Sequence, residues 1–103
     1  MKNHIYTITC THTKDKEGNT VDSEPTFQFE SYQHDSIEDI LAKLSDKHYF
    51  NDKKDLIRFI VGLKIMSSAM MHNRSSDFVR QLEPHFKEMM NIIKGRKPKN
   101  TNK

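Results

Sequence analysis

The sequence predicts an α+β domain, in which an N-terminal antiparallel β-hairpin packs against three or four α-helices. Two patterns of apolar residues along the chain predict this class. Before residue 33 apolar residues alternate with polar ones, which is typical of half-buried strands, and from residue 35 they recur at helical spacing. The 103 residues suit one domain. We assign 1–95 to that domain and 96–103 to a disordered basic tail.

Two strands are predicted, over 4–12 and 25–32. In the first, apolar residues alternate with threonines, and Cys10 lies on the apolar side as a small buried residue. In the second, Phe27 and Phe29 alternate with polar residues and are expected on the buried face. The segment between the strands has a glycine turn signal and no apolar periodicity, so it is expected to be an exposed loop.

Helices follow the hairpin. The first is expected to begin at Asp35 or Ser36, and the longest, central helix spans 52–72 and is apolar on two faces. Asn73 is expected to end it in the left-handed conformation. Pro84 predicts a break or kink in the last helical segment because proline lacks a backbone N–H. The helix count is therefore three or four.

Apolar periodicity also predicts the core. Its members share one face of each strand or helix. They are Tyr6, Ile8, Phe27, Phe29, Ile37, Ile40, Leu41, Leu44, Leu56, Phe59, Ile60, Leu63, Met66, Met70, Phe78, Leu82, Phe86, Met90 and Ile93.

The positive charge of the chain is concentrated at its end. The net charge is +3, and residues 94–103 hold five basic residues and no acidic one, so the remainder carries −2. This distribution disfavours a basic nucleic-acid-binding face. A nucleic-acid-associated protein that uses Arg74, Arg80 and the basic tail is kept as the alternative function.

Cys10 and His12 are the candidates for a metal site. They lie two residues apart in the first predicted strand, where side chains share a face about 6.6 Å apart. A closed zinc site needs two more ligands, and no C-x-x-C or H-x-x-x-H pair supplies them. The sequence also has no nucleophile elbow, phosphate-binding glycine loop or dinucleotide fingerprint. We therefore expect neither an enzyme nor a bound cofactor.

Short motifs along the chain resemble a small bacterial family of uncharacterised proteins, catalogued as a domain of unknown function. They are a Lys-x-His-x-Tyr start followed by an Ile-Thr step, a Gly-Leu-Lys helix segment, an Asn-Arg turn and an ending of the Phe-Met-x-x-Lys type, for which this chain has two methionines and a lysine. The residues that carry them are Lys2, His4, Tyr6, Ile8, Thr9, Gly62, Leu63, Lys64, Asn73, Arg74, Met89, Met90 and Lys94. The resemblance implies no catalytic residue.

We interpret the chain as a non-catalytic, homodimeric protein-interaction module of the cytoplasm. One cysteine excludes an internal disulfide, and the most apolar window, 56–71, is interrupted by charges and is shorter than the ~20 residues of a membrane span. A two-stranded hairpin is marginal by itself, and the central helix has a second apolar face. The expected interface residues are Thr7, Thr9, Thr11, Ile57, Val61 and Ile65.

Overall fold

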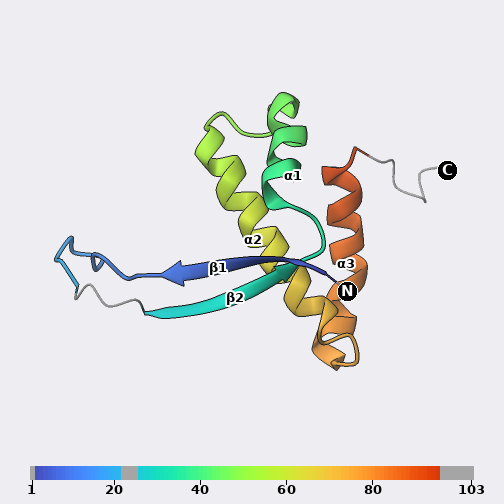
Figure 1. Cartoon of the computed structure of the whole chain (residues 1–103), viewed down its shortest axis with the longest axis horizontal. Helices are drawn as coiled ribbons and strands as arrows, with labels where there is room; N and C mark the ends of the chain where they lie inside the picture. The colour runs from blue at the N-terminus through green and yellow to red at the C-terminus, as the bar shows by residue number, and fades with distance from the viewer. Residues whose placement is uncertain (1, 22–25, 96–103) are drawn as a thin grey trace. The chain divides into compact units, whose positions relative to one another are not determined.

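The computed structural model describes residues 2–21 and 26–95. The elements in chain order are β1 (His4–Cys10), β2 (Phe27–Gln33), α1 (Ile37–Leu44), the short 3-10 helix η1 (Ser45–Lys47), α2 (Lys53–Met71) and α3 (Asp77–Ile93) (Figure 1). An antiparallel hairpin followed by three α-helices confirms the predicted α+β class. The predicted tail, 96–103, lies outside the described residues.

The chain divides into two compact units, and the boundary falls inside α2. The first unit extends to Ser68 and contains the hairpin, α1, η1 and most of α2, and the second begins at Ala69 and contains α3. The assignment of 1–95 to one domain stays a prediction. The central helix matches its expected range of 52–72 to within one residue at each end.

The two strands pair in one continuous register, from His4 opposite Gln33 to Cys10 opposite Phe27. Because side chains alternate between the two faces of a sheet, Phe27 and Phe29 share a face with Ser31 and Gln33. The expectation that both phenylalanines are buried is wrong, since Phe27 is 56% and Phe29 40% exposed. Cys10, opposite Phe27, is also exposed and not a buried residue.

The segment after β1 contains an ordered turn, which the sequence analysis described only as an exposed loop. The Asp15 carboxylate accepts hydrogen bonds from the backbone N–H groups of Glu17 and Asn19, at 3.0 and 2.9 Å. Gly18 has a φ of 89°, which favours glycine. An isolated antiparallel bridge between Lys14 and Thr20 closes the turn.

Side-chain caps define where the helices begin. Ser36 caps α1 by accepting a hydrogen bond from the Asp39 backbone N–H, and Ser76 caps α3 in the same way at Val79. At α2, the Asp52 carboxylate accepts from the Lys54 N–H at 2.9 Å. Each cap satisfies an N–H that has no partner within the first turn of its helix.

The core of the first unit is small. Ile60 of α2 is 1% exposed and fully enclosed, and Ile37 of α1 and Leu63 of α2 are buried at 6% and 7% exposed. Phe59 of α2 packs against Phe50, which precedes this helix, with ring centroids 5.4 Å apart. Met66 was also expected in the core but is 39% exposed.

Helix α3 differs from prediction at two points. It continues through Pro84, so the predicted break is wrong. The carbonyl of Arg80 loses a helical partner there, but both residues are exposed and water can satisfy it. The buried apolar residues are Val79 and Ile93, whereas Phe78 and Leu82 are 68% and 36% exposed and do not belong to the core.

Asn73 follows α2 but does not adopt the predicted left-handed conformation. Among the non-glycine residues of the described segments, only His48 has a positive φ. The Asn73 side-chain amide instead donates to the Ala69 carbonyl at 2.7 Å. A carbonyl near the end of the helix therefore gains a side-chain partner, without a left-handed residue at this position.

Two isoleucines of α2 provide a matched test of this core. Replacing Ile60, 1% exposed, with alanine should lower the free energy of unfolding by about 2–5 kcal/mol because it leaves a cavity. The same change at Ile57, 47% exposed, should cost less than about 1 kcal/mol. Urea unfolding at one protein concentration measures both, and equal losses would contradict the assignment of the core.

Candidate functional site

The end of β2 is attached to α2 through buried polar side chains. Gln33 and Ser31 are 3% and 6% exposed. The Gln33 amide donates to the Ser31 hydroxyl at 2.7 Å and to the Lys64 backbone carbonyl at 3.1 Å. One residue earlier in the strand, the Tyr32 carbonyl accepts from the Ser68 hydroxyl at 3.3 Å. These contacts fix the inner end of the hairpin against the helix.

A second attachment joins β1 to the first turn of α1. The Tyr6 hydroxyl donates to the Glu38 carboxylate and accepts from the Ile37 backbone N–H, the latter at 2.9 Å. The hydrogen bond from Tyr6 is the main reason that the pKa of Glu38 lies below its ordinary value of 4.5, and backbone and Ser36 hydrogen bonds also lower the pKa. Tyr6 thus contacts the two first residues of α1.

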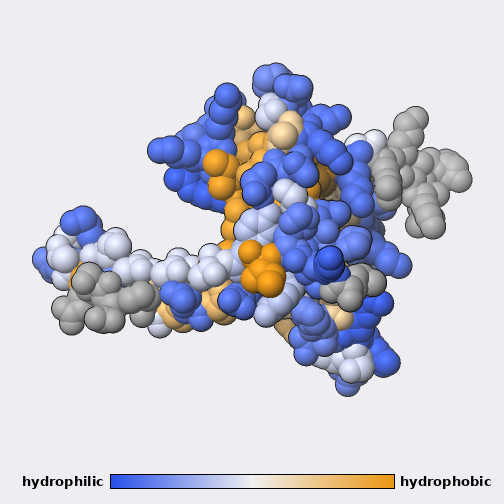
Figure 2. All heavy atoms as spheres, in the orientation of Figure 1, coloured by the Kyte–Doolittle hydropathy of each residue, from blue (hydrophilic) through white to orange (hydrophobic). Residues whose placement is uncertain are grey.

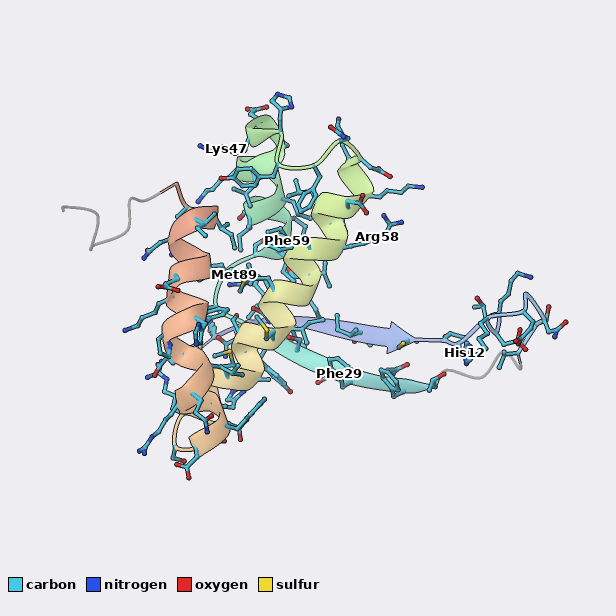
Figure 3. The ribbon with its side chains drawn as sticks, turned by 180° about the vertical axis from the view of Figure 1, so that it is seen from behind. His12, Phe29, Lys47, Arg58, Phe59 and Met89 are labelled. Atoms are coloured by element: carbon cyan, nitrogen blue, oxygen red, sulfur yellow. The ribbon has the colours of Figure 1, made fainter. Side chains whose placement is uncertain are left out.

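The hairpin face that carries Ser31 and Gln33 continues toward Cys10 and Phe27. There it is apolar, and no other described residue of the first unit covers it. Ile8 pairs with Phe29, and Cys10 pairs with Phe27. Ile8 is half-buried and the other three are exposed. Figure 3 shows Phe29 on the part of β2 that extends beyond α2. These four residues form an apolar strip that contains no charged side chain.

The opposite face of the hairpin carries Thr7 and Thr9, two of the expected interface residues. They lie opposite Glu30 and Gln28, and the Thr9 hydroxyl donates to the Gln28 side chain at 3.2 Å. All four residues are exposed. This face is therefore polar along its middle, and Thr11, the third expected threonine, lies just after the end of β1.

The other expected interface residues lie on α2. Ile57 is 47% exposed, whereas Val61 and Ile65 are half-buried. The three residues lie four apart and share one helix face, as expected. Only the first of them is largely accessible.

A groove of about 300 Å³ lies between α1 and the start of α2. Leucines and an isoleucine of the two helices form its walls, and the connection between the helices adds aromatic side chains. Figure 2 shows apolar side chains gathered between these helices. The lining residues are Leu41, Leu44, Ser45, His48, Tyr49, Phe50, Asn51, Lys53, Leu56 and Ile57. The sequence analysis missed this site, because its residues come from three segments that only folding brings together.

Of the two candidates for a metal site, only Cys10 belongs to the strand. Cys10 is the last residue of β1, and His12 lies beyond the strand, where its backbone N–H donates to the Thr26 hydroxyl at 3.2 Å (Figure 3). Within residues 2–21 and 26–95, no three His, Cys, Asp or Glu side chains are grouped so as to hold a metal ion. The described part of the chain therefore adds no ligand to this pair.

The arginines of the nucleic-acid alternative are both exposed in the second unit. Arg80 lies 4.0 Å from the Asp77 carboxylate, so an acidic group accompanies it on the surface. Arg74 lies in the turn before α3.

Of the helices described, none has the length and apolar character needed to cross a membrane.

A protein-family model matches most of the chain. Residues 4–95 match the model of DUF3861, described as a domain of unknown function with a solved structure. The chain belongs to the DUF3861 family. This membership confirms the resemblance to a family without assigned function. No curated protein and no solved structure matches the chain.

In this DUF3861 chain, Gln33 also escaped prediction from the sequence. The predicted second strand ended at Tyr32, one residue too early. A signal was present, because the alternation that places Phe27 and Phe29 on one face also places Ser31 and Gln33 there. Polar residues at the end of an apolar strand face thus indicated a buried hydrogen-bonded contact.

The contact between Tyr6 and Glu38 makes stability depend on pH. The pKa of Glu38 is lowered by folding, so its contribution is present above 4.5 and is lost as the pH falls through the folded-state pKa. Tyr6→Phe should therefore lower the urea midpoint at neutral pH. The difference between the urea midpoints of wild type and variant should become smaller in acid. It should not vanish, because the hydrogen bond from Ile37 does not titrate.

Urea unfolding at a series of pH values, at one protein concentration, measures this effect. Glu38→Gln is the control, since it keeps a side-chain acceptor for Tyr6 but does not titrate. In the Glu38→Gln background, the loss caused by Tyr6→Phe should be independent of pH across the same range. If Tyr6→Phe, made in the chain that keeps Glu38, destabilised the fold more in acid than at neutral pH, the role assigned to Glu38 would be wrong.

His48 occupies a backbone conformation that favours glycine, with φ 56° and ψ 40°. His48→Gly should raise the free energy of unfolding by about 0.5–1 kcal/mol because glycine has no Cβ to clash there. His48→Ala removes the imidazole but keeps the Cβ, so it should give no such gain. Thermal unfolding compares the variants, and a loss of stability in His48→Gly would show that the imidazole outweighs the backbone strain.

Proposed function

We propose that this member of the DUF3861 family is a non-catalytic, homodimeric protein-interaction module. The observation that carries the proposal is the exposed apolar strip of the hairpin, formed by Ile8, Cys10, Phe27 and Phe29. Phe27 is 56% exposed at the end of a strand whose inner residue Gln33 is 3% exposed. One sheet face is thus enclosed at one end and accessible at the other.

A second copy of the chain is the occupant that this strip fits. In a two-fold dimer, the same patch of each copy contacts the other. The strip contains no charged side chain, so self-pairing brings no like charges together. Two aromatic rings from each copy would supply the apolar area that interfaces concentrate at their centres. A hairpin that is marginal alone would gain a partner for its open face.

The proposed interface is on the hairpin face that carries the apolar strip. Thr7 and Thr9, which the sequence predicts as interface residues, are on the other face and lie outside this apolar strip. A cytoplasmic location is part of the proposal, because the single cysteine, Cys10, forms no internal disulfide that an oxidising compartment would favour.

Mass in solution tests the dimer. Light scattering over a wide range of concentrations should give twice the 12.2 kDa chain mass, falling to one chain mass on sufficient dilution. Phe27→Thr and Phe29→Thr should shift this transition to higher concentration by about tenfold or more, as loss of an aromatic anchor costs above about 1 kcal/mol. Both rings are accessible in the single chain, so its fold should persist.

Thr9→Ser is the matched control on the opposite hairpin face, and it should leave the transition unchanged. Cys10 gives an independent measurement, because alkylation of the only thiol should slow as the dimer forms. A single-chain mass at every concentration would overturn the proposal. An equal effect of Thr9→Ser and Phe27→Thr would exclude the apolar strip as the interface.

A further inference from the structure

The groove between α1 and the start of α2 is a preformed concave site. Leu41 and Leu44 line one side, and Leu56 and Ile57 line the other. Phe50 lines it as well, and this ring is held by Phe59, 5.4 Å away and outside the groove. Its volume of about 300 Å³ is at the lower end of the range of small-molecule sites. The groove lies wholly in the first unit.

The groove lining contains a basic residue and no acidic residue. Lys53 lines the groove, and no carboxylate does. Within the described residues Lys53 takes part in no ion pair. The carboxylates that follow or precede it in sequence are engaged elsewhere, since Asp55 lies 2.6 Å from Arg58 and Asp52 accepts from the Lys54 N–H. Lys53 is therefore a lysine of the groove lining that forms no ion pair within the described residues.

These two properties together select the chemistry of a ligand. A short hydrocarbon chain or ring would fill the space between the leucines, where burial stabilises by about 25 cal/mol for each Å² removed from water. An anionic group on the same molecule could form a charge-assisted hydrogen bond with Lys53. We propose that this groove binds a small amphipathic anion, such as a medium-chain carboxylate, with its carboxylate at Lys53.

Two probes of equal chain length separate the apolar and the charged parts of the proposal. Amide ¹H–¹⁵N spectra of the full chain are recorded during titration with octanoate and, separately, with 1-octanol. Octanoate should give saturable shifts at residues 41–57. Octanol should shift the same residues but bind about two- to fivefold more weakly, as expected for one accessible ion pair.

Two adjacent lysines provide the matched variants. Lys53→Gln should weaken octanoate binding by the same two- to fivefold and leave octanol binding unchanged, as an accessible ion pair predicts. Lys54→Gln, which removes an equal charge outside the groove, should leave both unchanged. Ile57→Asn should weaken both probes, because it makes one wall polar.

Four results would overturn the proposal. The first is no saturable shift at 41–57. The second is equal affinity for octanoate and octanol, which would remove the role assigned to Lys53. The third is an equal effect of Lys53→Gln and Lys54→Gln. Shifts confined to the hairpin would place the probe on the apolar strip and would likewise exclude the groove. None of these outcomes depends on whether the chain is a dimer.

Discussion

The side-chain amide of Gln33 donates to Ser31 and to the Lys64 backbone carbonyl, and so joins the last residue of β2 to α2. Gln33 is 3% exposed, and a buried amide without partners would cost about 1–3 kcal/mol. The strand end therefore has to stay where the helix offers that carbonyl. Within the described residues, no fully buried side-chain nitrogen or oxygen lacks a hydrogen-bond partner. The arrangement of the first unit depends on it.

Anchoring at one end determines what the other end of the hairpin exposes. Tyr6 adds the second attachment, to Glu38 and Ile37 of α1, again near the inner end. Beyond these contacts the strands continue past α2, the helix of the first unit to which β2 is attached, as Figure 3 shows at Phe29. The same alternation that buries Ser31 and Gln33 then leaves Phe27 and Phe29 accessible on that face. The apolar strip is thus a direct consequence of where the polar contacts are placed.

The two proposed surfaces differ in shape and charge, which is why they are assigned different ligands. The strip is carried by a projecting hairpin and has no charged side chain, so a second protein surface can cover it without like-charge contacts. The groove is concave and small, and Lys53 is its one lysine or arginine. A small anion can place its apolar part between the leucines and its charge at that ammonium. His48, in a conformation that favours glycine, lies in the connection that helps to form the groove.

The sequence by itself determined the elements, because periodicity and capping act between neighbours in the chain. It predicted the hairpin, the central helix to within one residue at each end, and Ser36 as one of two caps for α1. Pro84 shows the limit of that reasoning, since solvent access at Arg80 makes the lost hydrogen bond tolerable inside α3. Only the tertiary structure decided which apolar residues are covered. Alternation assigns Phe27 and Ile8 to one face, but whether a helix reaches that part of the face depends on where Gln33 meets Lys64. The groove likewise requires three segments to converge, and no local pattern specifies that convergence.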